Sequence, residues 1–409
     1  FVLTVSFLSG LYPSFYLAAF RPIQVIKGNL SRGAKNSKFR GTLVVFQFAT
    51  SIVLIICTIV TYRQMDFILN KKIGFNKDQV LMIQGASTLG NKAEAFRNEL
   101  TRLSAIENAA YTSYLPVDGT KRDGNSFWKE GRRKEDKGVG AQKWRVDENY
   151  LTTMGTKLVA GRNFSADRAS DSTAIIINES MVKEMGFENP IGQKITNSFE
   201  PTFHVIGVIE DFHFESFERE VGPLSLAYGS FGSIMAVRFQ PGNTDQMLAQ
   251  VKEVWDEFMP NQSIRYTFMD DSYARMYDQV NRTGKVFTLF AVLAVIVACL
   301  GLFALSAFMV EQRGKEISVR KVLGASTTQI FGLLTSNFVK LVMIAVVLAL
   351  PVGYYMMRSW LSDYKYHVDI TWDVYVIAGL VAVFISLLTI SSESLKAGWL
   401  NPAKKPRSE

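Results

Sequence analysis

The chain has 409 residues, 48% of them hydrophobic, and a mean hydropathy of +0.10. This length allows two or three folding units, and so modest an average excludes a protein made of membrane-spanning helices alone. The net charge of +8 does not indicate nucleic-acid binding, because the basic residues crowd the short loops at the ends of apolar runs. Two cysteines and three histidines leave little for disulfides or a metal site. Cys57 and Cys299 both fall inside apolar runs, which favours packed, reduced thiols.

Five apolar runs are each close to the ~20 residues that cross ~30 Å of hydrocarbon. The five runs are 1–19, 41–62, 286–310, 334–357 and 372–391. The first begins abruptly at Phe1, without an initiator Met, a basic n-region or a cleavage site, so it does not match a signal peptide. We interpret the sequence as starting inside a longer protein.

The loops between these runs predict the orientation of the chain. Lys and Arg are concentrated in the loop 20–40, the segment 311–333 and the tail 392–409. Short loops rich in Lys and Arg stay in the cytoplasm, so these three segments are expected there. The domain at 63–285 and the short loop 358–371 then lie outside.

The centres of the runs lack ionisable groups. No Asp, Glu, Arg or His lies near the centre of any run, and Gln47 and Asn337 are the main amides. Ion-driven carriers and channels place ionisable or unwound elements at mid-depth. The pattern therefore disfavours an ion-driven carrier or a channel.

The domain at 63–285 is predicted to have an α+β fold. Residues 75–115 follow the order strand, helix, strand, and the same order returns at 233–269, with Asn243 as a helix N-cap and Pro260 as a stop. Two such units can share one sheet and place their helices on one face of it.

A strand-rich insert, residues 120–222, separates these two units. Its clearest strands are 172–178 and 202–211, joined by a short helix that starts near Asn178. The stretch 121–138 mixes both signs of charge with glycine, and we interpret it as a solvated loop.

Catalytic motifs are not found in the sequence. It contains no G-x-x-x-x-G-K-[ST], G-x-S-x-G or H-E-x-x-H, so a membrane-anchored enzyme lacks the residues it would need. His204 and His213 flank a strand near Asp211, but their spacing matches no metal-ligand pattern, which favours ordinary surface or strand-edge histidines.

Two spans continue beyond the membrane as amphipathic helices. Their apolar stripes consist of Met65, Ile68 and Leu69 after the second span, and of Tyr273, Met276, Tyr277 and Val280 before the third. The two stripes could pack together as a two-helix stalk, or each could pack against the underside of the domain.

A cytoplasmic segment at 311–331 follows the third span. The spacing predicts a short helix over Glu316–Leu323 that ends at Gly324 in a left-handed C-cap. Ser326 and Gln329 have the spacing of a capping box for the next helix. The segment is either a membrane-surface loop or an element that receives force from a cytoplasmic partner.

The same segment resembles the E-R-x-x-E-I-G-x-R-x-x-x-G-A motif of FtsX-like ABC transporter permeases. The matching residues are Glu311, Arg313, Glu316, Ile317, Arg320, Gly324 and Ala325, whereas Ser318 stands where glycine is usual. Residues 144–165, 176–195 and 205–216 resemble the MacB-like periplasmic core domain. The tail 397–405 is similar to the closing A-x-x-x-N-P motif of the family, and 18–28 looks like a weaker copy.

The resemblance implies two tandem repeats, of which this chain holds the last span of the first and all of the second. It implies a polytopic α-helical membrane protein, with five transmembrane helices in this chain and a large α+β extracytoplasmic domain. The family is found in the bacterial cytoplasmic (inner) membrane. A full protein would have eight spans.

The resemblance further implies mechanotransmission for export or extraction of a substrate. A separate cytoplasmic ABC ATPase subunit would bind ATP and Mg, so this chain itself would hold no catalytic, cofactor or metal site. The expected ATPase-coupling residues are Glu311, Arg313, Glu316, Ile317, Arg320 and Lys321, with Gly324 as a hinge. A second permease copy, a periplasmic adaptor and membrane lipid are further candidate partners. The alternative is an FtsX-like regulator that activates a cell-wall hydrolase without transport.

Overall fold

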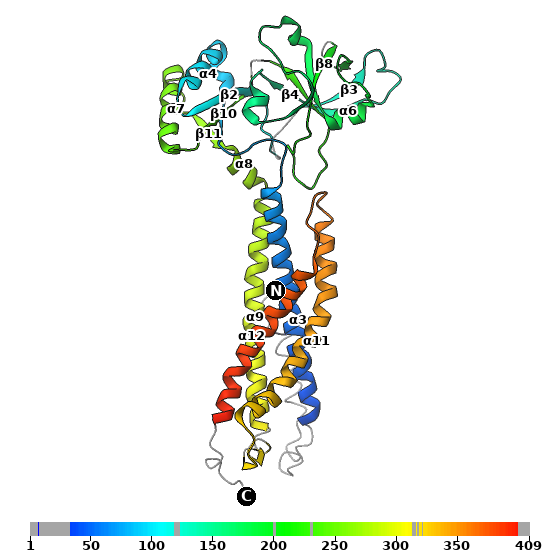
Figure 1. Cartoon of the computed structure of the whole chain (residues 1–409), viewed down its shortest axis with the longest axis vertical. Coiled ribbons are helices and arrows are strands. Elements are labelled where there is room, and N and C mark those ends of the chain that lie inside the picture. Colours follow the sequence, from blue (N-terminus) through cyan, green and yellow to red (C-terminus); the bar gives the residue numbers. More distant parts are fainter. Residues whose placement is uncertain are drawn as a thin grey trace. The chain divides into compact units, whose positions relative to one another are not determined.

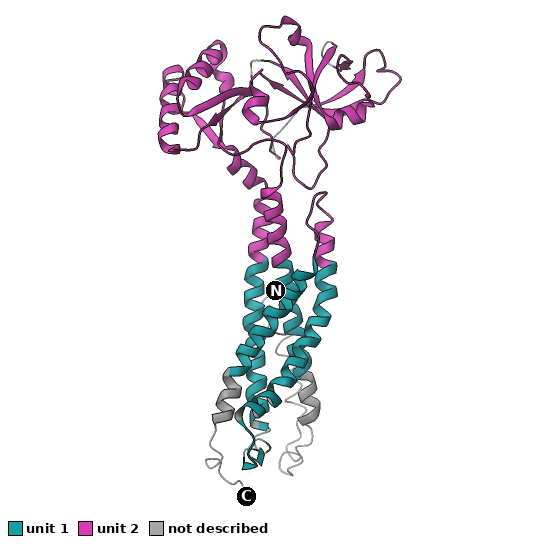
Figure 2. Ribbon diagram, in the orientation of Figure 1, with its two compact units in different colours: residues 1–58, 287–355, 371–409 teal, residues 59–286, 356–370 magenta. Residues whose placement is uncertain are grey.

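The computed structural model describes most of the chain as two compact units (Figure 2). The described residues are 33–117, 123–198, 202–229, 232–312, 316, 319–320 and 322–399, together with Phe7. The first unit comprises 1–58, 287–355 and 371–409, and the second comprises 59–286 and 356–370.

The first unit is helical. Within the described residues, four helices are long and apolar enough to cross a membrane. They are α3 (Gly33–Asn70), α9 (Asp278–Gln312), α11 (Thr327–Leu361) and α12 (Trp372–Trp399). These helices contain the last four predicted runs, while the run 1–19 lies outside the described residues apart from Phe7. Each helix is at least as long as the run it contains, and α3 begins inside the predicted loop 20–40.

Small residues let these helices approach closely. A Cβ atom added to Gly353 of α11 would lie 2.9 Å from Cδ1 of Ile56 on α3. A Cβ atom added to Gly301 of α9 would lie 2.4 Å from Oε1 of Gln47, also on α3. Such contacts are typical of helix packing in membranes, where close backbone approach replaces the hydrophobic effect.

The second unit is built on one sheet of eleven strands. The strands are β1 (Val80–Gln84), β2 (Ile106–Thr112), β3 (Gly124–Lys129), β4 (Val139–Val146), β5 (Leu158–Gly161), β6 (Ala174–Asn178), β7 (Lys194–Asn197), β8 (Phe203–Ile209), β9 (Leu224–Tyr228), β10 (Ile234–Phe239) and β11 (Arg265–Phe268). Their order is β11-β1-β10-β2-β4-β3-β7-β8-β6-β9, and β5 pairs with β8. Because β9 also pairs with β4, the strands from β4 to β9 close into a ring that removes exposed edges.

The unit also contains short helices. They are the 3₁₀-helices η1 (Ala86–Lys92) and η2 (Ala169–Thr173) and the α-helices α4 (Ala93–Arg102), α5 (Tyr150–Met154), α6 (Glu179–Met185), α7 (Thr244–Phe258) and α8 (Met269–Met276).

The two predicted strand–helix–strand units share the open end of the sheet. Helices α4 and α7 lie side by side on one face of β1, β2 and β10 (Figure 1). The ring of Phe96 meets that of Trp255 edge to face, with centroids 5.5 Å apart. Asn243 caps α7, since its side chain accepts a hydrogen bond from the amide of Gln246 at 3.2 Å. The α+β prediction is confirmed.

The insert forms the closed part of the sheet. Strands β6 and β8 run parallel and are connected through α6, whose N-cap Asn178 accepts from the amide of Met181 at 3.1 Å. The interpretation of 121–138 as a loop is wrong for its first half, because β3 occupies 124–129. Phe127 is fully buried in the core beside β6 and β8, and this burial holds the charged stretch in the sheet.

Candidate functional site

The segment after α9, which is predicted to be cytoplasmic, ends in a glycine turn. Arg320 and Val322 are helical, and Gly324 has a φ of +93°. The amide of Ala325 donates to the carbonyl of Arg320 at 2.9 Å. This bond spans five residues, as in a Schellman C-cap, and the left-handed conformation explains why glycine stands there.

A capping box starts α11 immediately afterwards. The hydroxyl of Ser326 accepts from the amide of Gln329 at 3.3 Å, and Gln329 Oε1 accepts from the amide of Ser326 at 3.0 Å. The residues predicted to form a box therefore form one. Between the end of the short helix and the start of α11 only a few residues remain, and their backbone groups are largely hydrogen-bonded.

The short helix presents both charges and apolar side chains. Arg320 and Glu316 form an ion pair of 2.9 Å one turn apart, and each side chain is roughly half exposed. Val322 and Leu323 are 76% and 80% exposed. The exposed apolar surface of Val322 and Leu323 was not predicted from the sequence, although two adjacent branched apolar residues could have indicated it. Among the other expected coupling residues, Glu311 lies in the last turn of α9, while Arg313, Ile317 and Lys321 lie outside the described residues.

The predicted stalk residues gather in one hydrophobic cluster of the second unit. The buried members are Met65, Ile68, Tyr273, Tyr277 and Val280, and the half-buried Leu69 and Met276 pack against them. The same cluster contains Trp144 and Phe212 of the domain. The residues of both stripes thus belong to one cluster with core residues of the domain, and direct packing of one stripe on the other stays a prediction.

The second stripe is not carried by one continuous helix. Helix α8 ends at Met276, Tyr277 leaves helical geometry with φ −108° and ψ 16°, and α9 starts at Asp278. The hydroxyl of Tyr277 accepts a hydrogen bond from the amide of Phe217 at 3.2 Å. The break lets Tyr277 point into the domain.

The loop between α11 and α12 also belongs to the second unit. Gln64 of α3 is fully buried and bridges to this loop: its Nε2 donates to the carbonyl of Tyr366 at 3.1 Å, and its Oε1 accepts from the amide of Val368 at 2.9 Å. From the sequence alone, 358–371 is predicted to be a short outer loop, and no role is predicted for Gln64. The feature that could have indicated this contact is a glutamine that lies next to the apolar positions of a helix stripe.

Lys71 and His213 complete this contact. The ammonium of Lys71 lies 4.2 Å from the ring centroid of Tyr366 and 5.5 Å from that of Phe217. The His213 ring stacks on Phe217 at 4.3 Å, and burial, followed by the charge of Lys71, lowers the pKa of His213 to about 4. His204 is exposed, as expected, but the expectation of a surface histidine is wrong for His213, because aromatic rings enclose it.

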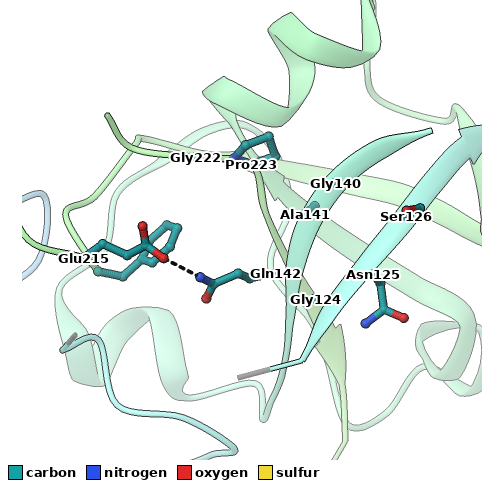
Figure 3. A pocket seen from close by; sticks show the side chains of 10 residues that line it. Gly124, Asn125, Ser126, Gly140, Ala141, Gln142, Glu215, Gly222 and Pro223 are labelled. Atoms are coloured by element: carbon teal, nitrogen blue, oxygen red, sulfur yellow. Dashed lines mark hydrogen bonds between the residues drawn. The ribbon is translucent and has the colours of Figure 1, made fainter. Parts of the chain in front are cut away.

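A cavity of about 360 Å³ opens elsewhere in the domain (Figure 3). Gln142 and Glu215 point toward one another across it and are joined by a hydrogen bond of 2.7 Å, while Trp144 Nε1 donates to Gln142 Oε1 at 3.1 Å. Two of its polar side chains, those of Gln142 and Glu215, thus bond to each other. Within the part of the chain that the structure describes, no cluster of His, Cys, Asp or Glu is suited to a metal ion.

Two family models match the chain. The model for the MacB-like periplasmic core domain matches residues 48–254, and that for the C-terminal FtsX-like permease domain matches 288–402. The chain belongs to the MacB/FtsX-like family of ABC transporter permeases. It is therefore a membrane protein that carries permease domains, and permeases of this family work with an ATPase.

Individual relatives are distant. The chain is 22% identical to the uncharacterized ABC transporter permease YknZ of Bacillus subtilis over 64% of its own length and 69% of YknZ. It is 25% identical to the macrolide export ATP-binding/permease protein MacB of Campylobacter jejuni, over 44% of its own length and 30% of that protein. The periplasmic region of MacB from Actinobacillus actinomycetemcomitans is 16% identical, covering 50% of this chain and 94% of that structure, with a TM-score of 0.36.

Proposed function

We propose that this permease is a mechanotransmission subunit for export or extraction of a substrate across or from the bacterial cytoplasmic membrane. A separate cytoplasmic ATPase binds and hydrolyses ATP as a dimer, and its closure pushes on residues 311–324. Helices α9 and α3 carry the movement to the outer domain. The substrate does not need to cross the lipid-embedded part.

The junction between α9 and α11 carries this proposal. A Schellman cap and a capping box lie back to back around Gly324, so the short helix is joined to α11 with little slack. A loose loop would dissipate a push, whereas a capped helix passes it to the spans. Its ion pair and exposed apolar side chains offer a mixed surface of the kind that protein interfaces use.

The apolar interior of the spans supports the same proposal. Within the described residues, each of the four candidate spans contains a long, strongly apolar stretch with at most two charged residues. A polar path through them would need charged or amide groups at mid-depth. A pushing mechanism needs none.

The test exchanges the charges of the short helix. The double variant Glu316→Lys with Arg320→Glu keeps an ion pair one turn apart, so the helix should survive, while the two charges that this pair offers to a partner are reversed. Like charges across an interface cost several kcal/mol, and we expect the permease to lose pull-down of its ATPase and stimulation of ATP turnover.

A matched control exchanges Arg132 and Asp136. These residues form an ion pair of 3.1 Å with the same spacing on the outer domain, so Arg132→Asp with Asp136→Arg should leave ATPase binding unchanged. Membrane insertion and melting temperature verify folding of both variants. If the Glu316/Arg320 exchange retains full binding and stimulation, residues 311–324 are not the coupling element.

A further inference from the structure

The loop between α11 and α12 contacts the same domain to which α3 and α9 are joined. We propose that this loop is a second mechanical attachment of the outer domain, so that α11 and α12 move the domain together with the stalk. The proposal rests on the mechanotransmission function given above. It assigns positioning roles to Gln64, Lys71 and Tyr366, on which the sequence analysis placed no function.

Gln64 is the central clamp of this attachment. Its side chain is fully buried, and both ends of its amide bond to the backbone of the loop, at Tyr366 and Val368. Leaving a buried polar group without its hydrogen-bond partner is unfavourable, because the group loses water and gains nothing in return. The loop therefore cannot leave α3 without exposing or abandoning the Gln64 amide, which fixes the loop to the stalk.

Tyr366 fixes the loop to the domain as well. Its amide donates to the carbonyl of Phe217 at 3.2 Å, and its ring contacts His213 edge to face with centroids 4.8 Å apart. The ammonium of Lys71, at the end of α3, lies over the same ring. One tyrosine thus joins the loop, the domain segment 213–217 and the end of the stalk.

Two routes from the cytoplasmic segment meet at Phe217. The amide of Phe217 donates to the Tyr277 hydroxyl, at the start of α9, and its carbonyl accepts from Tyr366, in the loop after α11. Helix α9 enters the short coupling helix from one side, and α11 leaves it on the other. A push on that helix can therefore reach one residue of the domain, Phe217, through either span.

An exposed ion pair at the edge of this contact contributes little to its stability. Lys365 forms an ion pair with Glu220, but both side chains are more than half exposed. Exposed ion pairs contribute little to stability because solvent screens them and both side chains lose freedom. Removing the pair with Lys365→Gln and Glu220→Gln therefore provides a variant that changes the surface and keeps the clamp.

The test uses the full-length permease with its ATPase in lipid nanodiscs. Hydrogen exchange is measured on peptides covering 212–217 and 361–368, with and without a non-hydrolysable ATP analogue. For Gln64→Leu we expect exchange in 361–368 to accelerate about tenfold, since local opening follows the lost bonds. The nucleotide-dependent change at 212–217 should fall to half or less, while ATPase binding and ATP hydrolysis persist.

Lys71→Gln is the second variant, in case Gln64→Leu does not fold. It should weaken the same response, Lys71→Arg should retain it because guanidinium also binds aromatic faces, and Lys72→Gln, at the exposed neighbouring position, should be silent. The Lys365/Glu220 control should also be silent.

The outcomes separate the two proposals. A wild-type protein without any nucleotide-dependent change at 212–217 would overturn mechanotransmission to the domain, and the attachment with it. A wild-type protein that responds, together with clamp variants that respond equally although 361–368 has loosened, would overturn only the second attachment.

Discussion

Gly301 faces Gln47 at the crossing of α9 and α3. The amide oxygen of Gln47 is buried and, among the described residues, has no hydrogen-bond donor. It lies so close to Gly301 that a methyl group there would overlap it at 2.4 Å. Glycine therefore permits both the close approach of the helices and a weak Cα–H···O contact to an otherwise unsatisfied oxygen.

We predict that Gly301→Ala destabilises the membrane helices. The added methyl group must push Gln47 or the helices apart, and overpacking costs about 1–3 kcal/mol. Thermal unfolding in detergent should show a lower midpoint. Gly332→Ala is the matched control, since no atom lies within 4 Å of the added carbon on α11. Equal midpoints for the two variants would contradict the close crossing.

At the scale of elements, the stalk joins two helices that are distant in sequence. The stripes of α3 and of α8 with α9 pack into one cluster. Nearer the membrane, a Cβ atom added to Gly284 of α9 would lie 3.3 Å from Cγ2 of Thr61 on α3. The added carbon meets the side chain of Thr61, so positions 61 and 284 face one another, as a disulfide with Cβ atoms about 3.5–4.5 Å apart requires.

We predict that Thr61→Cys with Gly284→Cys forms a disulfide on mild oxidation, after Cys57 and Cys299 have been replaced by alanine. A gel-mobility difference between oxidised and reduced protein measures it, because the crosslink closes a loop of more than 200 residues. Thr61→Cys with Arg282→Cys is the control, since the exposed Arg282 lies on another side of α9. Failure of the first pair in folded protein would refute the stalk packing.

At the scale of the whole molecule, the basic loops predict which side of the membrane each part faces. The predicted arrangement has the sheet domain outside and residues 311–324 inside, as the proposed mechanotransmission requires. Ser126 on β3 and Ser326 before α11 are both exposed within their own units, so each can report the side on which it lies.

We predict that, in intact cells lacking the native cysteines, an impermeant thiol reagent labels Ser126→Cys and spares Ser326→Cys. Cysteines at Ser31 and Ser408 should also be spared, because both positions lie in predicted cytoplasmic segments. Permeabilised cells provide the positive control. Labelling of Ser326→Cys from outside would reverse the topology and remove the ATPase from reach of the coupling segment.

The sequence by itself determined the features that depend on near neighbours. Apolar runs define the spans because the bilayer demands length and hydrophobicity, and the caps at Asn243 and at Ser326 with Gln329 form because their partners are three residues away. The glycine turn at Gly324 follows from a backbone conformation that other residues avoid.

Only the tertiary structure decided the contacts between distant residues. Gln64 bonds to Tyr366 across 302 positions, and nothing in the local pattern of either residue specifies the other. His213 has the sequence context of a surface or strand-edge histidine, but the rings of Phe217 and Tyr366 pack against it. The charged stretch that contains β3 has the composition of a loop, and only the fold shows that its Phe127 is buried. Long-range pairing depends on which surfaces the whole fold brings together, and local periodicity carries no record of that choice.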